Sequence, residues 1–183
     1  MVVGRQRAAA GRSGRRGAGR RDLLVQAAFN TIAEKGFEGL RLREVAAQAG
    51  IDHSTLHYHF PTRKDLVTAV VEFATSQFWT ATPGGGTNAQ NLPDHLAILA
   101  RMIQQRPALF IVLRELDLRA SRDPAVREII ERYEQGWRTA LAGRADDAAV
   151  ELVIATVKGV SFTPDRAAEV LARLGSLLAQ ERT

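Results

Sequence analysis

The stretch between residues 36 and 66 constrains the fold more than any other part of the chain. It reads GFEGLRLREVAAQAGIDHSTLHYHFPTRKDL. Apolar spacing predicts one short helix before Gly50 and a second short helix after it. Gly50 permits a tight turn between the two helices, and Pro61 ends the second one. This layout is that of a helix-turn-helix, and because we find no strand pattern elsewhere, the chain is predicted to be all-α.

Capping residues, prolines and apolar periodicity divide the 183 residues into about nine helices. The predicted ranges are 21–35, 42–48, 53–60, 62–79, 92–105, 107–120, 124–142, 146–160 and 164–180. Gly36 is expected to end the first helix in a left-handed conformation. Asp52 and Asp123 are expected to cap the helices that follow them. Residues 81–91 have the composition of a loop.

The excess positive charge of the chain lies at its start. Residues 1–21 contain seven arginines and no acidic residue, whereas the remaining 162 residues carry 18 basic and 20 acidic side chains. A Gly/Ala/Arg-rich segment has too little apolar surface to fold, so residues 1–20 are predicted to form a disordered arm. Such arms bind phosphate and can enter the minor groove of DNA. The alternative is a solubilising tail.

Composition also disfavours several classes of protein. The chain has no cysteine, which excludes disulfides and cysteine metal sites and suits a reducing, cytoplasmic compartment. No run approaches 18 apolar residues, so no membrane span is expected, and the interrupted apolar run after the early arginines is not an export signal. We find no phosphate-binding loop and no catalytic triad pattern, so neither an enzyme nor a cofactor is expected.

The second short helix is predicted to present a polar face to the major groove of DNA. The side chains on this face that can bond to base edges or phosphates are His53, Ser54, Thr55, His57, Tyr58 and His59. Arg43 can contact a phosphate or a guanine, and Arg63 and Lys64 stand at a helix start where free N–H groups favour phosphate. His53 and His57 have the spacing of metal ligands, but groove contact explains them better, and no metal site is predicted.

From about Arg21 to Leu66 the sequence resembles the DNA-binding segment of TetR-type transcriptional repressors. The resemblance rests on AEKGFEG, REVAAQAG and STLHYHFPTRKDL, and it covers about a quarter of the chain. It implies a three-helix DNA-binding domain at residues 21–66, with Arg43 reaching base or backbone and the polar residues of the second short helix meeting bases and backbone. Residues 67–183 resemble the family in helical layout only, which implies a helical ligand-binding and dimerisation domain.

The sequence departs from the family pattern at three positions in this segment. Arg63 stands where the family usually has a lysine near phosphate. His57 replaces a phosphate-contacting tyrosine and is shorter. Arg41 replaces a threonine or serine cap, so the helix has no side-chain cap there, although the arginine can contact phosphate.

A homodimer is expected because a single helix-turn-helix contacts too few base pairs for useful specificity. The helices predicted at 146–160 and 164–180 are rich in small and apolar residues, and the resemblance implies that they form a four-helix dimer interface. These residues are Ala148, Val150, Leu152, Val153, Ile154, Ala155, Val157, Val160, Val170, Leu171, Leu174, Leu177 and Leu178. The alternative is that they close the core of the monomer.

The helices between residues 62 and 142 would enclose a pocket if the protein senses a small molecule. The apolar candidates for its lining are Phe73, Phe78, Trp79, Met102, Phe110, Tyr133 and Trp137. The polar candidates are His95, Gln104 and Arg114. The alternative for each is an ordinary place in the core.

The leading interpretation is a sequence-specific transcriptional regulator. We expect a homodimeric repressor that a small-molecule effector releases from a palindromic double-stranded DNA operator. The alternative is a non-specific nucleic-acid-binding protein driven by the arginine-rich arm. The two differ in sequence preference at physiological salt and in their dependence on residues 1–21.

Overall fold

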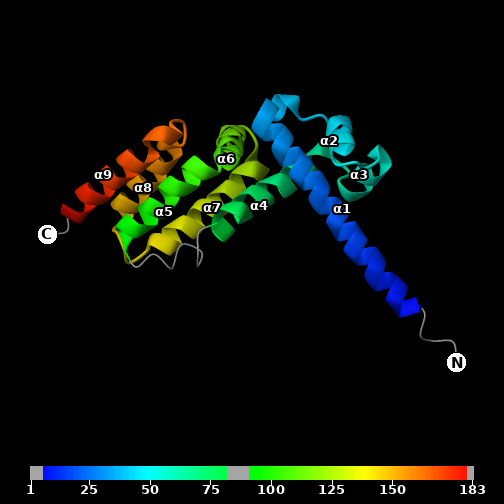
Figure 1. The fold of residues 1–183 in the computed structure, drawn as a ribbon, viewed down its shortest axis with the longest axis horizontal. Helices are drawn as coiled ribbons and strands as arrows, with labels where there is room; N and C mark the ends of the chain where they lie inside the picture. Colours follow the sequence, from blue (N-terminus) through cyan, green and yellow to red (C-terminus); the bar gives the residue numbers. More distant parts are fainter. Residues whose placement is uncertain (1–5, 82–90, 181–183) are drawn as a thin grey trace. The chain divides into compact units, whose positions relative to one another are not determined.

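A computed structural model describes the backbone of residues 6–81 and 91–180, and the side chains of residues 19–78 and 91–180. Within these residues the chain forms nine α-helices, two 3-10 helices and no β-strand, which confirms the predicted all-α class (Figure 1). The chain divides into two compact units, Met1–Val70 and Val71–Thr183. Most of the loop predicted at 81–91 lies outside the described residues. The division falls inside α4 (Arg63–Ala81), a few residues after the predicted boundary at 66.

The first unit is built on the contact of three helices with one another. They are α1 (Gln6–Lys35), α2 (Leu42–Gln48) and α3 (His53–His59), with η1 (Phe37–Gly39) between the first two. Leu24, Ile32, Val45 and Leu56 are fully buried at this contact. Burying an aliphatic side chain of this size contributes about 1.5–3 kcal/mol. The burial of their apolar faces therefore fixes the two short helices against α1.

The start of α1 differs from the sequence prediction. The helix begins at Gln6 and not near Arg21, so residues 6–20, predicted as a disordered arm, continue the helix in the structure. This stretch has no proline, and its alanines and arginines are strong helix formers, which favours the helix despite four glycines. Side chains before Gly19, and residues 1–5 altogether, lie outside the described part of the chain.

Two glycines with positive φ make the turns of the first unit. Gly36, with φ 65°, ends α1 as predicted, and its N–H donates to the Ile32 carbonyl at 2.9 Å. Gly50, also with φ 65°, joins α2 to α3. The N–H of Ile51 then donates to the Ala46 carbonyl at 2.9 Å and closes the turn. A residue with a Cβ is strained in this conformation, which explains the glycine at position 50.

The second unit is a bundle of packed helices in which α5 lies along α9 (Figure 1). Its helices are α5 (Leu92–Gln105), α6 (Pro107–Ala120), α7 (Pro124–Leu141), α8 (Asp147–Val160), η3 (Pro164–Arg166) and α9 (Ala167–Gln180). A Cβ on Gly175 of α9 would lie 3.3 Å from Leu96 Cδ1 of α5, so the glycine permits the close approach of these two helices. The chain predicted as one helix from residue 164 begins with a 3-10 turn.

Side-chain caps define where several helices begin. Asp52 and Asp123 cap α3 and α7 as predicted, since their carboxylates accept from the N–H groups of Thr55 and Ala125. Asn91 caps α5 in the same way. Arg41 precedes α2 and makes no side-chain cap bond, as the sequence predicted.

No single helix in the described ranges is long and apolar enough to cross a membrane. The pair α5 and α6, bent by 97° at its junction, passes that test by length and composition only. Its apolar side chains, including Leu99, Ile103 and Leu116, are buried within the unit.

Gly50→Ala is expected to lower the free energy of unfolding of the first unit by about 1 kcal/mol, because the left-handed conformation strains a residue with a Cβ. An added Cβ would meet no atom within 4 Å, so the loss reports backbone strain alone. Gly50→Asn should lose less, since asparagine adopts this conformation more readily. Urea unfolding followed by circular dichroism measures both. Equal losses, or no loss for the alanine variant, would contradict this account.

Candidate functional site

The first candidate site is the polar face of α3. His53, Ser54, His57 and Tyr58 are exposed, and Tyr58 keeps 83% of its surface open to solvent. Leu56, on the other side of the helix, is fully buried. The helix is thus held by its apolar side and presents its polar side outward, which is the arrangement that a groove-reading helix needs.

Asp52 organises the beginning of α3. Its carboxylate accepts hydrogen bonds from the Ser54 hydroxyl, from the Thr55 N–H at 2.9 Å and from the Thr55 hydroxyl at 2.7 Å. These bonds, that of Ser54 foremost, hold the pKa of Asp52 well below its ordinary value of 3.8. Each hydroxyl has one hydrogen, and those of Ser54 and Thr55 are used in the hydrogen bonds to Asp52. The two hydroxyl oxygens can therefore only accept a hydrogen bond from a ligand. The sequence predicted the cap but not this use of the two hydroxyls.

Aromatic rings complete the α3 face. The rings of His53 and His57 meet edge to face with centroids 4.4 Å apart, and those of Tyr58 and His59 do so at 5.3 Å. His59 and Thr55 are half-buried, so they are less accessible than the other predicted contact residues. Among the residues whose positions are described, no group of three or more His, Asp or Glu side chains is placed to hold a metal ion.

The predicted basic residues differ in their availability. Arg43 and Lys64 are exposed, as a phosphate contact requires. The Arg63 guanidinium donates to the Phe37 carbonyl at 2.6 Å, so this side chain also ties the start of α4 to η1. The guanidinium of Arg21 lies 5.1 Å from the centroid of the Phe60 ring, a cation–π contact that joins α1 to the end of α3.

Thr62 and Asp65 form a side-chain cap at the start of α4. The Thr62 N–H donates to Asp65 Oδ2 at 2.9 Å, and the Asp65 N–H donates to the Thr62 hydroxyl oxygen at 3.2 Å. This reciprocal cap occupies the N–H groups of Thr62 and Asp65. The phosphate contacts of Arg63 and Lys64 remain a prediction.

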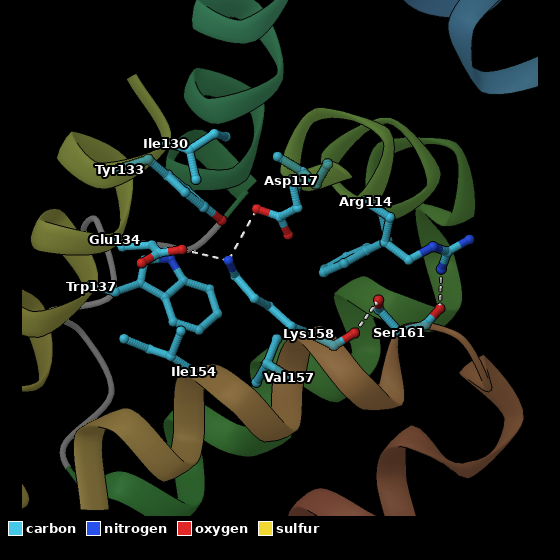
Figure 2. A pocket seen from close by; sticks show the side chains of 12 residues that line it. Arg114, Asp117, Ile130, Tyr133, Glu134, Trp137, Ile154, Val157, Lys158 and Ser161 are labelled. Atoms are coloured by element: carbon cyan, nitrogen blue, oxygen red, sulfur yellow. Dashed lines mark hydrogen bonds and ion pairs between the residues drawn. The ribbon is translucent and has the colours of Figure 1, made fainter. Parts of the chain in front are cut away.

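The second candidate site is a pocket between α6, α7 and α8, within the second unit (Figure 2). Its lining residues are Phe110, Leu113, Arg114, Asp117, Ile130, Tyr133, Glu134, Trp137, Ile154, Val157, Lys158 and Ser161. Its volume is about 30 Å³, which has room for about two water molecules. A drug-sized ligand takes roughly 300 Å³ or more, so the side chains must rearrange to admit one.

Only some of the predicted pocket residues line this cavity. Phe110, Tyr133, Trp137 and Arg114 do so. Other predicted residues lie elsewhere, because their helix positions face the core or the solvent: Met102 and His95 are buried, Phe73 is half-buried and Gln104 is exposed. The side chain of Trp79 lies outside the described residues. Phe78 does not line the pocket, but its ring is stacked on that of Trp137, which does, at a centroid distance of 4.8 Å.

Three charged residues that the sequence analysis missed form the polar centre of the pocket. Lys158 Nζ lies 3.0 Å from Asp117 Oδ1 and also donates to Glu134 Oε1 (Figure 2). Burial raises the pKa of the Asp117 carboxyl in spite of this ammonium. Burial works against the charged form of Lys158, but its bonds to Glu134 and Asp117 raise its pKa on balance. The sequence feature that could have indicated this cluster is Lys158, a single lysine within the mostly apolar sequence of α8.

The face formed by α8 and α9 is less apolar on its outside than the sequence suggested. Most of the residues predicted for a dimer interface are buried in the unit itself, including Val153, Val157, Leu171 and Leu178. The two helices must cover α5 and α7 as well as any partner, and this requirement accounts for the difference. Large apolar side chains that remain exposed on this part of the chain are Leu152, Phe162 and Leu177.

Comparisons with known proteins agree with this arrangement. Residues 24–70 match the family described as "Bacterial regulatory proteins, tetR family". The HTH-type transcriptional regulator CymR of Pseudomonas putida is 28% identical over 156 residues, which are 75% of each chain. The multidrug binding protein EbrR, crystallised with ethidium, is 30% identical with a TM-score of 0.66, over 85% of this chain and 98% of that one. A TetR-family member from Streptomyces coelicolor A3 is 28% identical with a TM-score of 0.71, over 85% and 97%.

The lowered pKa of Asp52 predicts a pH-dependent contribution to the stability of the first unit. Because the folded-state pKa is lowered, this contribution is present above the ordinary value of 3.8 and is lost as the pH falls through the folded-state value. Asp52→Asn can still cap the helix but carries no charge. The difference in unfolding free energy between the parent and this variant should therefore shrink from about pH 5 to about pH 3. Urea unfolding at both pH values tests this, and a constant difference would contradict it.

Proposed function

Because the chain belongs to the TetR family of DNA-binding transcriptional regulators, we propose that it is a repressor that a small-molecule effector releases from a palindromic operator. The proposal rests on the two sides of α3. Its Leu56 is buried against the rest of the unit, and its opposite face presents polar side chains to solvent. The relatives named above are regulators and binding proteins, and we propose no enzymatic activity. We also propose that the protein acts in the cytoplasm, where it can reach the chromosome.

The face of α3 is proposed to recognise bases through a limited set of hydrogen bonds. The hydroxyls of Ser54 and Thr55 donate hydrogen bonds to Asp52, so their oxygens are suited to accept from the exocyclic amino groups of adenine or cytosine in the major groove. His53, His57 and Tyr58 are exposed enough to contact bases or backbone. His59 is half-buried and is assigned a backbone contact. Specificity would then depend mainly on the first turn of the helix.

The electrostatic attraction to DNA is proposed to come from a few local groups. Residues 22–66 carry five basic and six acidic side chains, so this part of the chain is nearly neutral as a whole. Arg43 and Lys64 are exposed, and we assign them to phosphate or guanine contacts together with Arg63. The arginines of residues 1–20 would add phosphate contacts that are independent of sequence.

We assign dimerisation to α8 and α9. The exposed Leu152 and Leu177 lie on these helices, and Phe162 follows α8 directly. The assignment supposes that these side chains belong to one patch, since contiguous exposed apolar patches mark interaction sites. TetR-family regulators often act as dimers, and a dimer would place two α3 helices about 34 Å apart on a palindrome.

The α6–α7–α8 pocket is proposed as the effector site. EbrR is a multidrug binding protein that has been crystallised with imidazole, proflavin and ethidium, which supports a ligand-binding role for this chain. Here α4 begins in the first unit and ends in the second, where Phe78 stacks on Trp137 of the pocket wall. A ligand that moves Trp137 would displace the end of α4. The effector would thereby favour a state in which the paired recognition helices lose their groove spacing.

The competing function is a non-specific nucleic-acid coat that depends on the arginine-rich arm. Deletion of residues 1–20 separates the two, because phosphate contacts raise the salt dependence of binding and base contacts set its specificity. We expect the slope of log Kobs against log salt to fall by about 0.9 for each phosphate that the arm no longer neutralises. The preference for a duplex selected from random DNA over a scrambled duplex should remain.

A matched control keeps the length of the arm and replaces its six arginines, which are Arg5, Arg7, Arg12, Arg15, Arg16 and Arg20, with glutamine. The control should behave as the deletion does. If the deletion abolishes all binding, the coat is the better account. An unchanged salt slope would show that the arm does not contact DNA.

The double variant Leu152→Glu and Leu177→Glu is expected to convert the dimer to monomer, because buried like charges would face each other across the interface. Specific DNA binding should fall at least about tenfold with it, since one half-site alone binds weakly. Leu118→Glu, which changes an exposed leucine on α6, is the matched control and should remain dimeric. Sedimentation velocity reads the oligomeric state. A dimeric double variant would place the interface elsewhere.

A further inference from the structure

The ammonium group of Lys158 occupies the polar centre of the α6–α7–α8 pocket. It lies between two carboxylates that come from different helices, Asp117 of α6 and Glu134 of α7 (Figure 2). This arrangement is a site for one cation that the chain itself fills. The remaining groups of the pocket show whether another cation could take the same place.

The lining has two acidic and two basic side chains, but the two basic side chains are not both at the carboxylates. Arg114 is the other cation of the lining, and its guanidinium donates to the Ser161 carbonyl and lies 4.6 Å from the Phe162 ring. It is therefore engaged at the end of α8 and not at the carboxylates. Within the polar centre, Asp117 and Glu134 face the Lys158 ammonium. Glu134 also lies 3.5 Å from the guanidinium of Arg138, which is bonded more closely to Glu151. Three carboxylates therefore meet two cations, so a cation is favoured there over an anion.

Lys158 is also the member of this cluster that can leave most easily. Its side chain is 38% exposed, against 32% for Asp117 and 20% for Glu134. Its ammonium stands on a flexible four-carbon stem, whereas the carboxylates are on short side chains. The ammonium can therefore rotate into water and regain its hydration, while the two carboxylates stay in the pocket. Burial raises the pKa of Asp117 even with the ammonium beside it, so the ionised carboxylate favours a positive group nearby.

Aromatic rings lie beside the carboxylates. Trp137 is buried, and its ring lies 6.0 Å from that of Tyr133, with Phe110 on the adjoining helix. Flat apolar surfaces next to fixed negative charge suit a ring system that bears a positive charge, by stacking and by cation–π attraction. The present cavity of about 30 Å³ is too small for such a molecule. Entry therefore requires a lining side chain to move. Of the three charged residues at the polar centre, Lys158 is the most exposed and the most flexible.

We infer that the effector of this pocket is a flat aromatic cation whose positive group displaces the Lys158 ammonium from between Asp117 and Glu134. The inference rests on the proposed function, because it names the ligand class of the proposed effector site. Lys158 then acts as an internal competitor of the ligand. Its removal should strengthen ligand binding, which is the opposite of what a direct ligand contact would do.

The test measures the binding of ethidium, as a flat aromatic cation, to the full chain without DNA by its fluorescence. Lys158→Met should bind ethidium roughly tenfold more tightly than the parent protein, because the competing ammonium is gone. Asp117→Asn and Glu134→Gln should each bind it roughly tenfold more weakly. Arg132→Met removes an exposed positive charge from α7 outside the pocket and is the matched control, with affinity within about twofold of the parent.

Circular dichroism confirms that each variant is folded, and Lys158→Gln replaces the methionine variant if the latter does not fold. Weaker ethidium binding by the lysine variant, or no ethidium binding by any variant, overturns the inference. So does binding of the anionic dye anilinonaphthalene sulfonate to the parent that disappears in the lysine variant, since Lys158 would then be an anion ligand. Binding of a selected DNA duplex is measured in parallel. If the protein binds the selected DNA but the ethidium results fail, this inference alone is rejected. If ethidium binds as expected but the DNA does not, only the proposed repressor function is rejected.

Discussion

The burial of a few apolar side chains against α1 is the constraint on which the proposed function depends. Helices α2 and α3 have seven residues each, and helices of that length do not persist alone in water. Leu56 and Phe60 are almost completely buried, and Gly50 sets the angle at which the chain enters α3. The cation–π contact of Arg21 with Phe60 and the bond from Arg63 to the Phe37 carbonyl hold the ends of the same assembly. These contacts leave the polar face of α3 in a fixed position, as groove recognition requires.

The second unit follows a different principle, because its pocket has charged groups at its centre. A half-buried ammonium between two carboxylates adds little to stability, since desolvation offsets much of the attraction. It does give the pocket a defined polar geometry beside the aromatic rings of Trp137 and Tyr133. The same helix α4 that begins beside the α3 face ends with Phe78 stacked on this pocket wall. A small-molecule signal would therefore have a covalently continuous helix through which to act, provided that ligand entry displaces Trp137.

The sequence predicts the fold well where local chemistry decides the structure. Gly36, Gly50, Asp52 and Pro61 mark helix ends through their own backbone or capping preferences, and the exposed α3 face follows from helical periodicity. It predicts less where the outcome depends on tertiary packing. The bond from Arg63 to the Phe37 carbonyl joins residues 26 positions apart, which periodicity does not reveal. The sequence did not predict the Lys158 cluster, because it joins three helices that are far apart in sequence. It also did not predict the start of α1, because alanine and arginine favour a helix where the composition indicated disorder.

The proposal on which the others depend is that the chain recognises a specific palindrome through two copies of α3. The most direct measurement is selection of bound duplexes from a random DNA library at about 150 mM salt, followed by sequencing. We expect enrichment of a palindrome with half-sites about ten base pairs apart from centre to centre, or a multiple of that spacing. Tight binding without any enriched sequence would contradict it, because phosphate contacts alone would then account for the affinity.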